Sequence, residues 1–406
     1  MSPAVAGRVW RFVSARALNT FGRSMINATV LWELYDRTHD KLVLAGVGIV
    51  QVLPVVLLFV PAGTIVDRID RRWLATVAAL GTGLVGIGLA AASALDAPVW
   101  VYLALLLLQG CVVSIHAPAA SSLLANIAPR EELPRANRIL SSLSETAQIS
   151  APALAGLALL VVDAHLVYAA VALTGLASST LYRSLPEVPR VLAPESGRRD
   201  WRVGLRFIFR SPLLLPALTL DMFAVLFAGV TALLPAIATD ILGVGPFGYG
   251  ILRASQSVGA VAMAVIGGRL AAWRRPGRVL LIVVALFGAA TIGVGLSTSL
   301  VVTVLLLFAC GALDNISVVI RLTLEQLVVP DAIRGRVGAV HNVFIGMSNE
   351  LGAAESGFAA AVLGTVPAIV AGGSLAMLVV GVVAIGWPSL ARMPPLAELE
   401  PEPCDQ

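Results

Sequence analysis

Long apolar segments recur along the whole chain, and they decide what it can fold into. Apolar residues make up 58% of the 406 residues and charged residues only 13%, with a mean hydropathy of +0.90. A helix needs about 20 apolar residues to cross the roughly 30 Å hydrocarbon core of a bilayer. About twelve segments reach that length. They cover residues 12–34, 42–62, 73–95, 98–124, 136–162, 165–185, 213–240, 248–272, 279–297, 300–328, 337–363 and 366–390. The sequence predicts an all-α integral membrane protein with about twelve transmembrane helices.

Basic residues gather on one side of the predicted membrane. The connections that follow even-numbered spans are rich in arginine, whereas the opposite connections carry only Arg37 and Lys41. The positive-inside rule then places both termini in the cytoplasm. The net charge of +4 does not indicate a nucleic-acid partner, because the basic residues have no single folded domain on which to gather.

One long polar stretch divides the chain. Residues 186–211 leave six predicted spans on each side, so we expect a six-helix bundle over 1–185, a cytoplasmic linker over 186–211 and a second six-helix bundle over 212–392. Apolar and basic residues alternate over 201–210, which favours a short helix on anionic lipid over a regulatory site. The acidic, proline-containing tail 393–406 is expected to be disordered.

The connection between the second and third spans carries a charged motif, G-x-x-x-D-R-x-x-R-R. Its residues are Gly63, Asp67, Arg68, Arg71 and Arg72. The motif resembles the loop signature G-x-x-x-D-R-x-G-R-R of the major facilitator superfamily, with Asp70 in place of the usual glycine. The resemblance implies a conformational latch on one face of a transporter, with Asp67 near Arg336 at the start of the eleventh span. The alternative is a basic loop that only sets topology.

Two further segments resemble this superfamily. The run from Gln326 to Val337 reads Q-x-x-x-P-D-x-x-R-G-R-V and resembles the bacterial transmembrane secretion effector branch, which contains siderophore exporters and drug efflux proteins. The fifth span resembles the antiporter signature with alanine for most glycines, or else shows ordinary small-residue packing. Its residues are Ala147, Ala151, Pro152, Ala155 and Gly156. The resemblance implies a monomeric multi-pass protein of a bacterial cytoplasmic (inner) membrane, with substrate bound near the midplane between two parallel repeats.

Polar and charged side chains inside the spans are the candidates for the transport pathway. A charge at a helix centre costs about 2.5–3.5 kcal/mol on insertion scales, so such a group tends to face a bundle interior or water. In the first span, polar residues from Arg16 onwards recur on one helical face. The candidates for the cavity or substrate site are Asn19, Arg23, Asn27, Gln51, Gln148, Arg253, Gln256, Asp314, Arg321 and Asn349.

Carboxylates within the spans are candidates for proton exchange, because burial in an apolar cavity favours the neutral form. We expect Arg321 to neutralise Glu325 four residues later on the same helix. The preferred proton carriers are Glu145, Asp221, Glu350 and Glu355. His116 and His341 could also titrate, but a lone histidine on a helix is more often packed or hydrogen-bonded, and we interpret both in that way.

The sequence contains no phosphate-binding G-x-x-x-x-G-K-[ST] loop and no His/Cys cluster with metal-ligand spacing. We therefore expect no enzyme activity, no cofactor and no metal, and a gradient as the energy source. The leading hypothesis is a secondary active transporter that exports a siderophore or an amphipathic drug in exchange for protons by alternating access. One alternative is a proton-coupled uptake permease of the same fold. The other is a non-transporting membrane scaffold or sensor.

Overall fold

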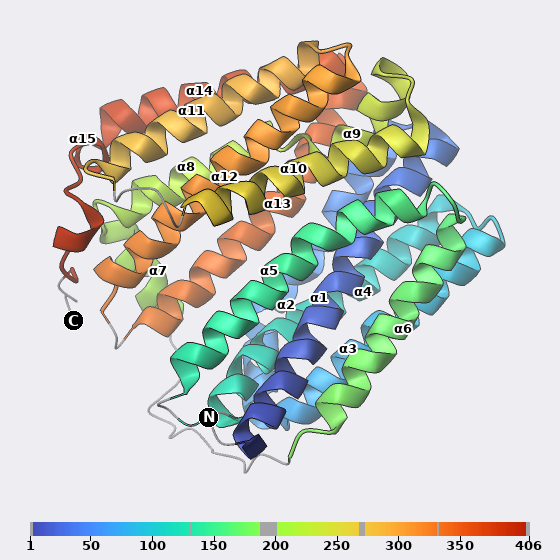
Figure 1. Ribbon diagram of the computed structural model, residues 1–406, viewed down its shortest axis with the longest axis horizontal. Helices are drawn as coiled ribbons and strands as arrows, with labels where there is room; N and C mark the ends of the chain where they lie inside the picture. The colour runs from blue at the N-terminus through green and yellow to red at the C-terminus, as the bar shows by residue number, and fades with distance from the viewer. Residues whose placement is uncertain are drawn as a thin grey trace. The chain divides into compact units, whose positions relative to one another are not determined.

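The computed structural model describes residues 3–127, 129, 132–186, 201–267, 273–330 and 333–402. These ranges are helical almost throughout and contain no strand (Figure 1). The prediction of an all-α chain is therefore confirmed. The position of both termini in the cytoplasm remains a prediction.

The helices follow the hydropathy pattern closely. In the first half they are α1 (Pro3–Thr38), α2 (Lys41–Arg68), α3 (Arg71–Ala94), α4 (Val99–Ile127), α5 (Leu133–Ala158) and α6 (Ala164–Arg183). A short helix α7 (Trp201–Arg210) precedes the second half. The second half contains α8 (Leu214–Ala228), α9 (Leu234–Ala236), α10 (Gly245–Gly267), α11 (Pro276–Leu296), α12 (Leu300–Val328), α13 (Arg334–Leu363), α14 (Thr365–Gly386) and α15 (Pro388–Ala391).

In the described ranges, nine segments are long and apolar enough to cross a membrane. They lie in α2, α3, α4, α6, residues 214–241, α10, α11, α12 and α14. The three other predicted spans coincide with α1, α5 and α13, which are long helices that carry more charged and polar side chains. Their charged and polar side chains explain why these three helices are less apolar than the other nine segments.

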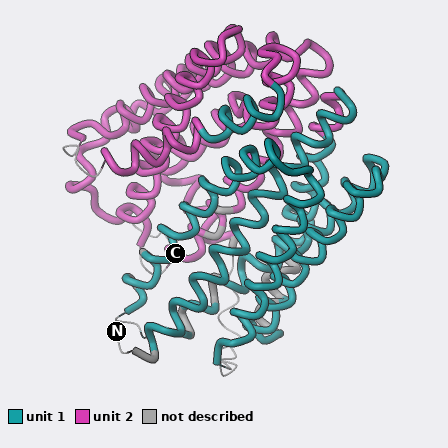
Figure 2. The backbone as a smooth tube through the Cα atoms, turned by 45° about the vertical axis from the view of Figure 1, so that its right-hand side comes forward, with its two compact units in different colours: residues 1–39, 46–195, 245–254 teal, residues 40–45, 196–244, 255–406 magenta. Residues whose placement is uncertain are grey.

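The chain forms two compact units (Figure 2). Unit 1 contains Met1–His39, Gly46–Glu195 and Gly245–Ala254, and unit 2 contains the remaining segments, Asp40–Ala45, Ser196–Val244 and Ser255–Gln406. The start of α2 thus belongs with second-half helices, and the start of α10 belongs with first-half helices.

Specific contacts hold the start of α2 in unit 2 and the start of α10 in unit 1. In unit 1, the Tyr249 hydroxyl of α10 donates to the Ala28 carbonyl of α1 at 2.7 Å, and its ring lies 5.0 Å from that of Trp32. In unit 2, Lys41 at the start of α2 forms an ion pair with Asp240 at 3.7 Å.

Small residues allow the helices of unit 1 to approach closely. A Cβ on Gly86 of α3 would lie 2.9 Å from the Ala172 nitrogen of α6, and a Cβ on Gly250 of α10 would lie 2.8 Å from the carbonyl carbon of Gly156 in α5. Helices in a bilayer gain stability mainly from such close packing, because lipid tails are as apolar as the side chains they replace.

The seventh predicted span is a broken helix in unit 2. α8 ends before Gly229, and a 3-10 turn (Val230–Leu233), α9 and a π-helical segment (Ile237–Ile241) continue the span. The hydroxyl of Thr291 donates to the Ala228 carbonyl at 3.3 Å, and that of Ser356 donates to the Gly229 carbonyl at 3.4 Å. Neighbouring helices thus satisfy carbonyls that the break removes from the helix ladder.

Asp70 begins α3. Its Oδ1 atom accepts hydrogen bonds from the backbone N–H groups of Arg72 at 2.8 Å and Trp73 at 3.4 Å. Its φ of −57° lies outside the left-handed region, so this connection does not require the glycine of the family signature. An N-terminal cap replaces the glycine turn here.

Two segments of unit 2 pack more extensively than we expected. The apolar side of α7 lies against α13 and the core, with Ile208 only 1% exposed, whereas Arg206 and Arg210 are exposed. The expectation that the apolar side of α7 lies on lipid is therefore wrong, because that side packs against the protein core. In the tail, Leu396 and Leu399 pack against the core of unit 2.

The end of the described tail is also anchored. The backbone N–H of Glu402 donates to the Val328 carbonyl at 2.9 Å, and Met393 is 2% exposed. We expected disorder over 393–406, but residues 393–402 are ordered by these apolar contacts and this hydrogen bond. The other four residues of the tail lie outside the described ranges.

Candidate functional site

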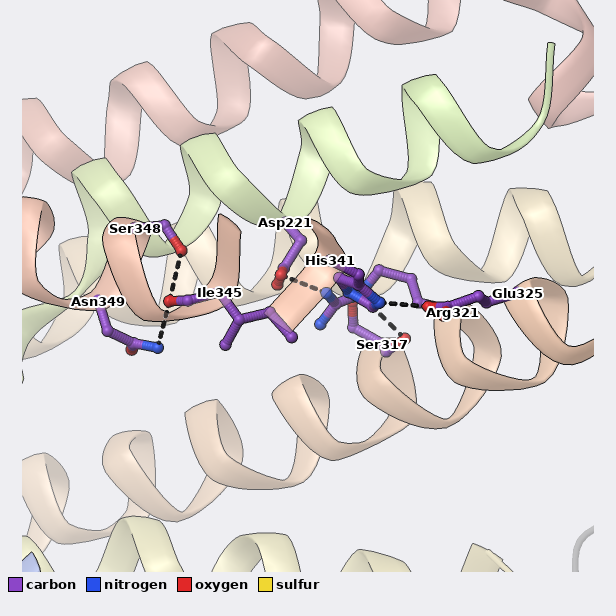
Figure 3. Close-up of polar contacts among 8 residues, drawn as sticks. All are labelled: Asp221, Ser317, Arg321, Glu325, His341, Ile345, Ser348 and Asn349. Atoms are coloured by element: carbon purple, nitrogen blue, oxygen red, sulfur yellow. Dashed lines mark hydrogen bonds and ion pairs between the residues drawn. The ribbon is translucent and has the colours of Figure 1, made fainter. Parts of the chain in front are cut away.

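A buried ion pair joins α8 and α12 in unit 2. The Asp221 carboxylate contacts the Arg321 guanidinium, and their side chains are 10% and 3% exposed (Figure 3). The Nε atom of Arg321 also donates to the carbonyl and hydroxyl oxygens of Ser317, at 3.3 Å and 3.2 Å. A charged pair so shielded from water is expensive to insert and is typical of a functional site in a membrane protein.

A second buried pair joins α12 and α13. Glu325 contacts Nδ1 of His341, and the two side chains are 11% and 4% exposed (Figure 3). The expectation that Arg321 neutralises Glu325 is therefore wrong, because neighbouring helices supply Asp221 and His341 as partners instead. The interpretation of His341 as a hydrogen-bonded side chain is confirmed.

Asp314 brings another carboxylate to this cluster. Asp314, Ser317 and Arg321 follow i, i+3, i+7 spacing on one face of α12. Asp221, Asp314 and Ser317 line one small cavity of about 10 Å³, otherwise lined by apolar residues. That volume is close to the minimum for a single water molecule.

The electrostatics of this group follow from its composition. Arg321 supplies one positive charge against the two carboxylates of Asp221 and Asp314, and solvent reaches the site poorly. We call Asp221, Asp314, Ser317 and Arg321 the α8–α12 charge cluster.

Unit 1 contains buried polar atoms that have no hydrogen-bond partner among the described residues. Asn19 of α1 and His116 of α4 form a hydrogen bond of 3.4 Å between Nδ2 and Nδ1, and both residues are buried. The Oδ1 atoms of Asn19 and Asn27 and the Nε2 atom of His116 are shielded from solvent and have no hydrogen-bond partner within the described chain. Unsatisfied buried polar atoms are rare in native proteins and call for a ligand or water.

The sequence analysis missed one buried carboxylate. Glu33 of α1 is 5% exposed, and its Oε1 atom forms an ion pair with Arg37 at 2.6 Å. Oε1 also accepts from the hydroxyls of Ser93 at 2.6 Å and Tyr102 at 2.9 Å. The i, i+4 spacing of Glu33 and Arg37 was a readable signal, but α3 and α4 supply the other two partners.

The remaining proton-carrier candidates lie in diverse environments. Glu145 is exposed on α5, whereas Glu350 and Glu355 are half-buried on α13. The carboxylate of Glu355 accepts a long hydrogen bond of 3.5 Å from the Ser356 hydroxyl. None of these three joins the α8–α12 charge cluster.

The remaining cavity candidates differ in their exposure. Gln148 and Asn349 are exposed, Gln51 is buried, and Arg23, Arg253 and Gln256 are half-buried. Asn349 donates to a carbonyl of its own helix at 2.9 Å, and Gln256 accepts from Thr231 at 3.4 Å. Of this set, Asp314 and Arg321 join one cluster together with Asp221.

The predicted latch falls partly outside the described side chains. The backbone of Gly63, Asp67 and Arg68 forms the last turns of α2, but their side chains lie outside what the structure describes. Arg71, Arg72 and Arg336 are half-buried. The pairing of Asp67 with the start of α13 remains a prediction.

The small-residue face of α5 is buried in unit 1. Ala151 and Ala155 are 0% exposed and Ala147 is 8% exposed, while Pro152 and Gly156 are also buried. α5 packs against α1, and Gly156 closely approaches Gly250 of α10. Its role in antiport remains a prediction.

Membrane-length helices in two bundles, with charged pairs buried between helices, define a multi-pass membrane transporter. The model of the Major Facilitator Superfamily matches residues 12–353, and the chain belongs to this superfamily.

Sequence relatives include an exporter. The enterobactin exporter EntS of Shigella flexneri is 28% identical over 323 residues, which cover 79% of this chain and 77% of EntS. EntS of Escherichia coli O81 (strain ED1a) is 27% identical over 323 residues, with the same coverage of both chains.

Solved structures share the fold. A bacterial homologue of the human lysosomal transporter Spinster, inward-facing and unoccupied, matches with a TM-score of 0.70 at 15% identity over 97% of both chains. A D-xylose-proton symporter matches with a TM-score of 0.73 at 13% identity, over 97% of this chain and 99% of that one. At these identities the likeness concerns the fold alone.

Proposed function

We propose that this transporter exports a small siderophore-like or amphipathic molecule across a bacterial cytoplasmic membrane in exchange for protons. The observation that carries the coupling is the buried Asp221–Arg321 pair beside Asp314. The direction is supported by the relatives named as enterobactin exporters and by the secretion-branch run from Gln326 to Val337.

The α8–α12 charge cluster is suited to couple protonation to helix movement. A proton on Asp221 neutralises its carboxylate and leaves Arg321 without its counter-ion. An unpaired buried charge costs about 3–5 kcal/mol, so Arg321 gains by turning to Asp314 on its own helix. The link between α8 and α12 is then released, and alternation between inward-open and outward-open states follows.

The break in the seventh span makes α8 a reasonable element to move. Gly229 follows Asp221 by eight residues, or about two helical turns. Because the span is already interrupted at Gly229, α8 can move after a change at Asp221 without breaking a continuous ladder of backbone hydrogen bonds.

The unpartnered polar atoms of unit 1 support a role in substrate recognition. Two amide oxygens, of Asn19 and Asn27, and one imidazole nitrogen, of His116, are shielded and unsatisfied in the described chain. Hydroxyl and amide groups of a siderophore-like molecule offer suitable partners for them. An apolar compound without such groups would leave these atoms unpaired, which costs about 1–3 kcal/mol per group.

Everted membrane vesicles test the proposal. We expect siderophores or amphipathic drugs to collapse an imposed pH gradient with the wild-type protein, and Asp221→Asn or Asp314→Asn to abolish the collapse while substrate still binds. The control Asp163→Asn removes a carboxylate whose side chain is 85% exposed, and it should behave as wild type.

The outcomes separate the alternatives. Accumulation of substrate in intact cells, driven by an inward proton gradient, would identify an uptake permease. Full coupling in both Asp221→Asn and Asp314→Asn would refute the assigned role of the charge cluster. If added substrate changed neither the pH gradient nor accumulation in cells, and the purified protein bound no substrate, a scaffold or sensor would be favoured.

A further inference from the structure

Four exposed arginines line one open cavity on the surface of unit 2. The cavity has a volume of about 290 Å³ and is lined by Arg274, Arg275, Arg278 and Arg392, with Pro394 and Pro395 among the other lining residues. None of its lining residues in the described part of the chain is acidic. We propose that this cavity binds the phosphate of an anionic membrane phospholipid.

The walls of the cavity are fixed by packing. Nε of Arg278 donates to the Ala391 carbonyl at 3.3 Å, which ties the start of α11 to α15. Met393, which follows Arg392, is 2% exposed in the core of unit 2. The packed tail thus carries Arg392 to arginines more than a hundred residues earlier in the chain.

The charge of the cavity calls for an anion. Four guanidinium groups in one cavity repel one another, and the start of α11 adds the positive end of its helix dipole. Arginine presents several donors in a planar fork that matches phosphate oxygens. Basic residues that only set topology need to lie on one side of the membrane, but they need not converge on one cavity.

The size of the cavity favours a head group over a large solute. Sites for drug-sized molecules usually have volumes of about 300–1,000 Å³, so this cavity lies just below the lower limit. A phosphate with a small substituent such as glycerol is the class of ligand that we assign to it.

Exposed apolar residues lead away from the arginines along two neighbouring helices. On α11, Arg278, Ile282 and Leu286 recur on one face, and Ile282 and Leu286 are 57% and 51% exposed. On α14, which packs against α11, Val382 and Ile385 are 57% and 82% exposed. Acyl chains would lie on these residues, whereas a soluble phosphate would gain nothing from them.

Native mass spectrometry of the full-length protein in detergent tests the proposal with dihexanoyl phosphatidylglycerol as the probe. We expect this lipid to bind with a clear preference over dihexanoyl phosphatidylcholine. An arginine near anionic lipid contributes about fivefold to affinity. Arg392→Gln should therefore weaken binding about fivefold, and Arg275→Gln/Arg278→Gln about 25-fold.

The matched control removes two exposed arginines from α7, also in unit 2. Arg206→Gln/Arg210→Gln should leave phosphatidylglycerol binding unchanged. Equal losses in the two double variants, or equal binding of the two lipids, would overturn the proposal. Arg275→Lys/Arg278→Lys retains the charge but not the planar fork and should bind more tightly than the glutamine variant, so a loss caused by misfolding of the glutamine variant is recognised.

Soluble phosphates distinguish the source of the ligand. Inorganic phosphate and glycerol 1-phosphate should compete only at concentrations far above that of the lipid, because they lack acyl chains. Competition by glycerol 1-phosphate at the same concentration as the lipid would overturn the assignment to a membrane phospholipid and identify a soluble phosphate ester as the ligand.

Discussion

The Asp221–Arg321 pair gives a quantitative test of how unit 2 tolerates buried charge. Arg321→Met removes the cation and leaves the carboxylate of Asp221 in place, and Asp221→Leu does the reverse. The double variant Asp221→Leu/Arg321→Met removes both charges. These three variants form a thermodynamic cycle with the wild type.

The magnitudes follow from burial. The side chains are 3% and 10% exposed, so water screens neither charge once its partner is gone. Arg321→Met should lower the free energy of unfolding by about 3–5 kcal/mol, whereas apolar replacement of both partners is often neutral or stabilising. Asp221→Leu should cost less than Arg321→Met, because Arg321 then turns to Asp314 on its own helix. Loss of the hydrogen bonds from Arg321 to Ser317 leaves the double variant about 1 kcal/mol less stable than the wild type.

Unfolding in mixed micelles of SDS and maltoside, followed by tryptophan fluorescence, measures these differences. Asp96→Asn is the control, because Asp96 pairs with Arg37 at 3.3 Å but its side chain is 90% exposed. That substitution should have no measurable effect. The reasoning would be refuted if the double variant lost as much free energy of unfolding as the two single variants together, or if the single variants were as stable as the wild type.

Three further predictions concern packing, capping and the tail. Gly156→Ala would place a Cβ against Gly250, so mixed-micelle unfolding should show a loss of about 1–3 kcal/mol, whereas Gly335→Ala meets no atom within 4 Å and should cause none. Asp70→Ala removes the cap of α3 and should lower the free energy of unfolding by about 1 kcal/mol in the same assay, with Asp70→Gly losing only a few tenths. Burial raises the pKa of the Glu402 carboxyl, so docking of the tail is strongest below the ordinary pKa of this group and weakens as the pH rises through the raised value. Amide exchange at residue 402, compared with Glu402→Gln, should show that pH dependence only in the wild type; equal behaviour would contradict it.

Hydropathy predicted the helices well for a physical reason. Lipid leaves no water to satisfy the backbone, so each crossing must be a helix about 20 residues long. The predicted span 300–328 has the same limits as α12, and the predicted span 213–240 covers α8 and all but the last residue of its continuation. The break at Gly229 was not predicted, since it depends on hydroxyl groups from α11 and α13.

Side-chain partners were harder to predict. Spacing along one helix identified the polar face that carries Asp314 and Arg321, but it assigned Arg321 to Glu325. The structure gives Arg321 to Asp221 on α8, because contacts between helices decide among several partners within reach. The ordered tail was missed for a similar reason, since Leu396 and Leu399 find a surface that only the folded unit provides.

Unit 1 and unit 2 each bury an ion pair, whereas Asn19 and Asn27, whose amide oxygens are unsatisfied in the described chain, lie in unit 1. A coupled transporter requires one site for protons and one for substrate. In unit 2, Asp221 and Arg321 satisfy each other across two helices, so a proton changes which helices are joined. In unit 1, the amide oxygens of Asn19 and Asn27 have no hydrogen-bond partner among the described residues and are available to a ligand or water. Under the proposed function, Asn19→Ala or Asn27→Ala should change which compounds are transported while protons still move with them. Asp221→Asn should instead leave the choice of compound intact and separate its movement from that of protons. If substitutions in unit 1 uncoupled transport, and substitutions in unit 2 changed only specificity, this division between the two units would be wrong.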